Sequence, residues 1–82
     1  MAKLKKNVAI SENGFIFNAA RGDSFSTNEI GAKIMKALQN GQDERQIIAQ
    51  LVETYNVDAA TCEKDVYDFL KSLNHYSLLQ QI

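Results

Sequence analysis

The spacing of apolar residues changes once along the 82-residue chain, near Ser26, and this change limits the folds that the chain can adopt. Before Ser26, apolar and polar residues alternate, which is the period of strands with one buried face. Two turn signals interrupt the alternation: Asn13-Gly14, which tolerates the positive φ of a tight hairpin, and Arg21-Gly22-Asp23. The sequence therefore predicts three strands in an antiparallel meander, within the segments Asn7–Ser11, Phe15–Ala19 and Ser24–Ser26.

Beyond Ser26, apolar residues recur at helical spacing in three segments. Ser26 or Thr27 is the predicted cap of the first helix, because Glu29 completes a capping box with Ser26. Asn40-Gly41 is the predicted end of that helix, and Asp43 is expected near the start of the next, where its charge suits the helix dipole. The predicted inward-facing residues of the three helices are Ile30, Ile34, Ala37 and Leu38, then Ile47, Ile48, Leu51, Val52 and Tyr55, and then Cys62, Val66, Phe69, Leu70 and Leu73.

The third helix is predicted to run from about Ala59 to Asn74, after a break at residues 56–58. The tail that follows, His75–Ile82, is apolar enough to pack as a final strand or turn. The chain is therefore predicted to be one α+β domain over residues 1–82, winged-helix-like, with an N-terminal three-stranded antiparallel sheet followed by three helices. Residues 1–6 are rich in lysine and are expected to be disordered.

The chain carries few residues suited to catalysis or to metal binding. Its one histidine, His75, and its one cysteine, Cys62, do not form the closely spaced ligand pairs of a zinc site. Cys62 falls on the inward stripe of the third helix, where a thiol is usually inert. The sequence therefore predicts no enzyme, no cofactor and no metal. No apolar run is long enough to span a bilayer and no secretory leader is visible, so the expected compartment is the cytoplasm.

The third predicted strand differs from the other two because it has one large apolar residue, Phe25, between two serines. A polar strand with a single anchored residue suits the edge of a sheet. At an edge, one row of backbone donors and acceptors stays unpaired.

From Phe25 onward the sequence resembles the PqqD family, the pyrroloquinoline quinone synthesis protein D type. The family's pattern has an aromatic residue, an LN-x-x-G helix start, an I-A-x-x-L helix that ends in Tyr, and a DV-x-x-FL-x-x-L helix. Thr27 stands where the family usually has Leu, and Met35 where it usually has Trp, which leaves open whether the pathway is quinone synthesis or another one. The resemblance covers roughly Val8 to Leu79. The matching residues are Asn28, Gly31, Ile34, Gly41, Ile48, Leu51, Tyr55, Asp65, Val66, Phe69, Leu70 and Leu73.

The resemblance implies a non-catalytic domain that recognises a ribosomally made precursor peptide. Such domains hold the leader segment of the precursor and present it to a modifying enzyme, often a radical S-adenosylmethionine protein. The leader is expected to add as a fourth strand beside the third strand, in a groove closed by the third helix. Free main-chain groups at a sheet edge supply hydrogen bonds to an extended peptide. The expected backbone ladder is formed by Asp23, Ser24, Phe25, Ser26 and Thr27.

Periodicity does not fix which shoulder of the third helix faces the peptide. Glu63, Tyr67 and Lys71 lie on one shoulder, and Asp65 and Ser72 lie on the other. Tyr67 is the preferred contact, since a flanking aromatic side chain offers apolar area at low entropic cost. Lysines on this helix suit an acidic leader. The predicted helix contacts are Glu63, Lys64, Tyr67 and Lys71.

Two alternatives remain at this point. A winged-helix DNA-binding domain has the same elements, but the net charge of −1 and an acidic third helix oppose contact with phosphates. A generic interaction domain would use the same edge to bind another protein or a second copy of the chain, since strand exchange is a low-cost route to dimers. The sequence therefore predicts no nucleic-acid or membrane partner and leaves a homodimer open.

Overall fold

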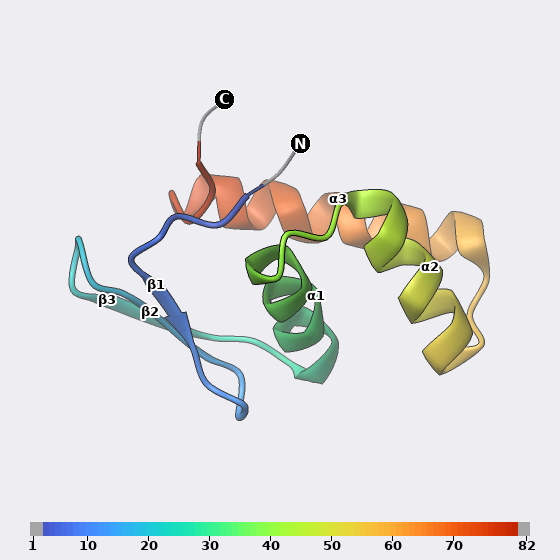
Figure 1. Ribbon diagram of the computed structural model, residues 1–82, viewed down its shortest axis with the longest axis horizontal. Coiled ribbons are helices and arrows are strands. Elements are labelled where there is room, and N and C mark those ends of the chain that lie inside the picture. The colour runs from blue at the N-terminus through green and yellow to red at the C-terminus, as the bar shows by residue number, and fades with distance from the viewer. Residues whose placement is uncertain (1–2, 81–82) are drawn as a thin grey trace.

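Six elements follow one another in the order that the periodicity predicts (Figure 1). The computed structural model describes residues 3–80, and its sheet has the antiparallel order β1-β2-β3. The prediction of an α+β fold with three strands followed by three helices is therefore confirmed. The elements are β1 (Val8–Ile10), β2 (Phe15–Asn18), β3 (Asp23–Ser26), α1 (Glu29–Gln39), α2 (Glu44–Tyr55) and α3 (Ala59–His75).

The hairpin between β1 and β2 depends on Gly14. Its φ of +85° lies in the left-handed region, which favours glycine. A Cβ at this position would also collide with the backbone carbonyl of Thr27, which follows β3. The predicted Asn13-Gly14 turn is thus confirmed, and it brings the start of β2 against the end of β3.

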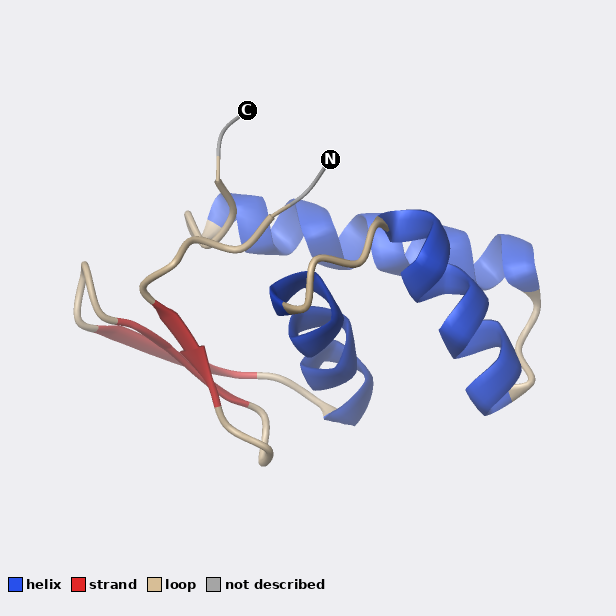
Figure 2. Cartoon of the chain, viewed as in Figure 1, coloured by secondary structure: helices blue, strands red, loops and turns tan. Residues whose placement is uncertain are grey.

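The two faces of the sheet differ sharply because successive side chains of a strand point to opposite sides. Val8, Ile16 and Asn18 are buried on the inner face, on which the helices lie (Figure 2). On the outer face Phe15 is 62% exposed and Phe17 is 46% exposed. In β2 both faces carry apolar residues, so alternation alone did not show which face would be covered.

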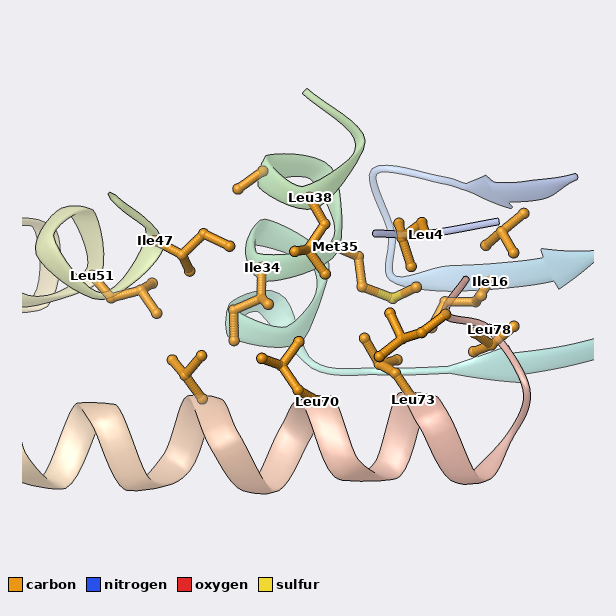
Figure 3. Close-up of a cluster of buried hydrophobic side chains, with 14 of the residues drawn as sticks. Leu4, Ile16, Ile34, Met35, Leu38, Ile47, Leu51, Leu70, Leu73 and Leu78 are labelled. Carbon is orange, nitrogen blue, oxygen red and sulfur yellow. The ribbon is translucent and has the colours of Figure 1, made fainter. Parts of the chain in front are cut away.

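The core joins the inner face of the sheet to all three helices (Figure 3). Met35 of α1 lies at its centre with none of its surface exposed, and Ile47 of α2 and Leu70 and Leu73 of α3 are also buried. Methionine is unbranched and flexible, so it fills an irregular space between layers.

The helix starts confirm one expectation and correct another. Asp43 caps α2, and Gln46 completes a capping box with it. The cap of α1 is Asn28, whose side-chain oxygen accepts from the amide of Gly31 at 2.8 Å, so the expected cap at Ser26 or Thr27 is wrong. The physical reason is that both candidates are engaged in the sheet: Ser26 belongs to β3, and the Thr27 amide donates to Gly14.

The two ends of the described chain pair with each other. Leu4 forms a bridge with Leu79, and both side chains are buried. The Lys5 amide donates to the Leu78 carbonyl at 3.0 Å, and the Gln80 amide donates to the Lys3 carbonyl at 2.7 Å. The expected disorder of residues 1–6 therefore does not describe residues 3–6, because Leu4 anchors them in the core. Residues 1 and 2, which were expected to be disordered, and residues 81 and 82, which belong to the predicted C-terminal tail, lie outside the described residues.

Candidate functional site

The free edge of the sheet is the outer side of β3. Strand β3 pairs only with β2, and the register places Phe25 opposite Ile16 and Ser24 opposite Phe17. The hydrogen bond from the Thr27 amide to the Gly14 carbonyl, at 2.8 Å, shows which residues turn their backbone groups toward β2. In an antiparallel pair these residues alternate, so Phe25 also faces β2, while Ser24 and Ser26 face outward.

The pairing of β2 with β1 supports this assignment. The Ser11 amide donates to the Phe15 carbonyl, and the Ala19 amide donates to the Asn7 carbonyl, so the odd-numbered residues of β2 face β1. The even-numbered residues of β2 are left to face β3. Four backbone groups of β3 therefore point away from the sheet: the N–H and C=O groups of Ser24 and Ser26.

Nothing within residues 3–80 occupies this edge. The C-terminal tail, which is the segment best placed to add as a strand, pairs with Lys3 and Lys5 instead. Of the five residues predicted to form the ladder, the geometry selects Ser24 and Ser26. Asp23, Phe25 and Thr27 direct their backbone groups toward β2.

One shoulder of α3 lies against β3 and the start of α1. The ring centroids of Phe25 and Tyr76, the residue that caps the C-terminus of α3, are 4.8 Å apart. A Cβ on Gly31 would lie 3.0 Å from the Phe69 ring, so α1 approaches α3 closely at this glycine. Phe69 and Tyr76 are two helical turns apart and share one side of the helix. The shoulder that faces β3 is therefore the one with Asp65 and Phe69.

The four predicted helix contacts lie elsewhere on α3. Tyr67 is two residues from Phe69, which corresponds to about 200° around a helix, and its side chain is 49% exposed. Glu63, Lys64 and Lys71 are also exposed, at least about 120° from Phe69. The structure does not bring these four residues to the edge of β3, and their role as peptide contacts remains a prediction that the geometry does not favour.

An apolar pocket lies among the three helices, and Asn28, two residues after the end of β3, is one of its lining residues. Its volume is about 310 Å³. Asp65 and Tyr55 are among its lining residues, and the Tyr55 hydroxyl is buried without a hydrogen-bond partner. Its lining is mainly apolar, so it suits an apolar side chain. The lining residues are Asn28, Ile30, Gly31, Ile34, Leu51, Tyr55, Val57, Thr61, Cys62, Asp65, Val66 and Phe69.

The groups near this pocket are poorly suited to catalysis. Burial raises the pKa of the Cys62 thiol, and the negative charge of Asp65 raises it further. A thiol with a raised pKa is a poor nucleophile at neutral pH. Within residues 3–80, no three histidine, cysteine, aspartate or glutamate side chains gather closely enough to hold a metal ion. In the same part of the chain, no helix combines the length and the apolar character that a bilayer crossing requires.

Comparisons with known proteins agree with this geometry. Residues 13–79 match the family described as Coenzyme PQQ synthesis protein D (PqqD). No curated protein matches the sequence. A solved structure described as TbiB1 in complex with the TbiA(beta) leader peptide is 25% identical, with a TM-score of 0.88 over 98% of this chain and 96% of that chain. Another, described as lasso peptide synthetase B1 complexed with the leader peptide, is 17% identical and shares the fold, with a TM-score of 0.84 over 98% of each chain.

Proposed function

This chain belongs to the PqqD family, and we propose from that premise that it binds the leader segment of a ribosomally made precursor peptide by strand addition to β3. The observation that carries the proposal is the outward row of Ser24 and Ser26 backbone groups, which no segment within residues 3–80 pairs with. The similarity to the structure described as a leader-peptide complex, at 25% identity, supports a leader peptide as the ligand.

The geometry defines how a peptide strand would meet β3. Ser24 and Ser26 each offer one N–H and one C=O group, so two alternate peptide residues would exchange up to four hydrogen bonds with them. The peptide residue opposite Phe25 would point its side chain to the inner face, toward Tyr76. A residue farther along the peptide would place an apolar side chain in the pocket.

The domain would act without catalysis of its own. With its leader held as a strand, the remainder of the precursor would be delivered to a separate peptide-modifying enzyme, such as a radical S-adenosylmethionine protein, in the cytoplasm. Binding at an edge constrains only the backbone of a few residues, so it leaves the segment to be modified free to enter another active site.

The proposal is tested by titrating isotope-labelled protein with the leader peptide of the precursor that is encoded beside this chain. The amide signals of Ser24 and Ser26 should shift most within β3, because these amides would gain hydrogen bonds. Signals from Ile30, Gly31 and Phe69 should shift as the pocket fills. A titration at micromolar peptide that leaves β3 unchanged would refute the proposal.

A further inference from the structure

The outer face of the sheet carries the most exposed aromatic side chains of the described strands. Phe15 and Phe17 are neighbours on this face and are 62% and 46% exposed. Their cross-strand neighbours are small and uncharged, so nothing covers the two rings. We call this surface the outer face and define it by the residues Ala9, Phe15, Phe17, Ser24 and Ser26.

The outer face is continuous with the edge at which a peptide would add. Cross-strand neighbours place their side chains on the same side of a sheet. Peptide residues paired with Ser24 and Ser26 would therefore project on the outer face, next to Phe17 and Phe15. The peptide residue between them would project inward. An added strand thus divides its side chains between a set that contacts this domain and a set that stays exposed beside the two phenylalanines.

The exposed aromatic area alone is too small to hold a partner. A phenylalanine side chain buries 150–250 Å² when it is covered, so the exposed parts of Phe15 and Phe17 amount to roughly 200 Å². A stable specific interface needs about 800 Å² from each partner. Two copies of this chain would lack the required area if they met through these rings. A partner that also covers the outward side chains of the added strand gains a larger contact surface.

We propose that the outer face, through Phe15 and Phe17, docks an uncharged apolar surface of the enzyme that modifies the bound peptide, and that the outward side chains of the added strand complete this docking surface. This inference rests on the proposed strand addition. It assigns the two phenylalanines to recruitment of the enzyme and not to binding of the peptide. The enzyme would then bind the loaded domain more tightly than the empty one, because only the loaded domain presents the whole surface.

The test uses the double substitution Phe15→Ser and Phe17→Ser, with Glu53→Ser as the control. Glu53 is exposed on α2, outside the sheet and outside the residues that line the pocket. Two quantities are measured: the affinity for the fluorescent leader peptide, and the rate at which the enzyme encoded beside this chain modifies the full precursor when the domain is limiting. Circular dichroism monitors folding, and Phe15→Ser alone, at the more exposed position, serves as a second variant.

We expect the double variant to bind the leader within twofold of the wild type, while the domain concentration needed for half-maximal modification rises at least tenfold. The control should change neither quantity. In the peptide, an aspartate at either outward position should leave binding intact and slow modification, whereas an aspartate at the inward position should abolish binding.

Three results would overturn the inference. Modification by the double variant at the wild-type rate would show that the enzyme does not use this face. A tenfold loss of leader affinity would assign the phenylalanines to the peptide site. A wild-type dimer in sedimentation that the double variant makes monomeric would assign the face to a second copy. Absence of leader binding by the wild type would instead refute the proposed function itself.

Discussion

Substituting proline for Ser26 isolates the backbone ladder from every other contribution to peptide binding. Proline removes the amide hydrogen, and its ring fills the space through which that hydrogen points. The Ser26 amide faces outward, so no hydrogen bond within the sheet is lost, and proline is tolerated on an edge strand when its nitrogen faces away from the sheet. Peptide binding should therefore fall while the free energy of unfolding changes by less than about 1 kcal/mol.

The size of the binding loss follows from the number of groups affected. One hydrogen bond contributes about 1 kcal/mol, and the peptide carbonyl left without its donor costs about 1 kcal/mol more at a partly solvated edge. A total of about 2 kcal/mol corresponds to roughly 30-fold weaker binding. Fluorescence anisotropy with the labelled leader peptide measures the affinity, and urea unfolding measures stability.

Two control variants distinguish the effect of losing the Ser26 amide from the effect of losing its side chain and from a general loss of stability in β3. Ser26→Ala keeps the amide and should bind within twofold of the wild type. Thr27→Pro removes an amide that donates to Gly14 at 2.8 Å, so it should lower the free energy of unfolding by about 1–3 kcal/mol. Wild-type affinity in the Ser26→Pro variant, or an equal loss in Ser26→Ala, would refute the strand-addition geometry.

Three further substitutions test the packing around the site. Phe25→Ala should lower the free energy of unfolding by about 2–3 kcal/mol in urea, because the ring packs on the core and on Tyr76 at 4.8 Å; a change below 0.5 kcal/mol would contradict this packing. Gly31→Ala should lower the melting temperature by several degrees, since its Cβ would collide with the Thr27 hydroxyl and press on the Phe69 ring; an unchanged melting temperature would show that both side chains can move away without cost. The raised pKa of Cys62 favours the neutral thiol in the folded state, so its contribution to stability is present below its ordinary pKa of about 8.5 and is lost as the pH rises through the raised value. The urea midpoint should therefore fall more steeply above about pH 9 in the wild type than in Cys62→Ala, and parallel pH profiles would contradict this account.

The order of the elements follows from local signals that no tertiary contact overrides. The change of period near Ser26, the Asn13-Gly14 turn and the helix start at Asp43 each depend on a few neighbouring residues, so the sequence alone predicts them. Phe25 also stands out locally, because a single ring between serines is typical of an edge strand.

Features that depend on distant segments were not predictable in the same way. Ser26, Thr27 and Asn28 are all suitable caps for α1, and the choice is made by the bond between Thr27 and Gly14. Leu4 lies among lysines in the sequence, and its burial depends on core residues from distant segments, including Leu79, with which it forms a bridge.

The sequence also does not identify the side of α3 that faces β3, and the reason is related. Helical spacing gives the angle between two side chains but does not identify the neighbour that each one meets. One signal was available: Gly31 lies inside the first predicted helix, where glycine is costly unless another element comes close. Thr27 and the Phe69 ring both come close to this glycine, and the position of the ring selects the shoulder with Asp65 over the shoulder with Tyr67.

The shortness of the free edge decides where the selectivity of the domain must come from. Four outward groups on Ser24 and Ser26 provide about 4 kcal/mol of net hydrogen bonding, which is at the lower limit of the 4–15 kcal/mol estimated as the cost of bringing two molecules together. The ladder alone therefore binds no peptide tightly, and it also fails to join two copies of the chain through their edges. Burial of one large apolar side chain in the pocket of about 310 Å³ adds about 1.5–3 kcal/mol, and the inward side chain beside Phe25 and Tyr76 adds more. A peptide with an intact backbone but without these two apolar anchors is accordingly expected to bind too weakly to be delivered, so the anchors and not the ladder distinguish one leader from another.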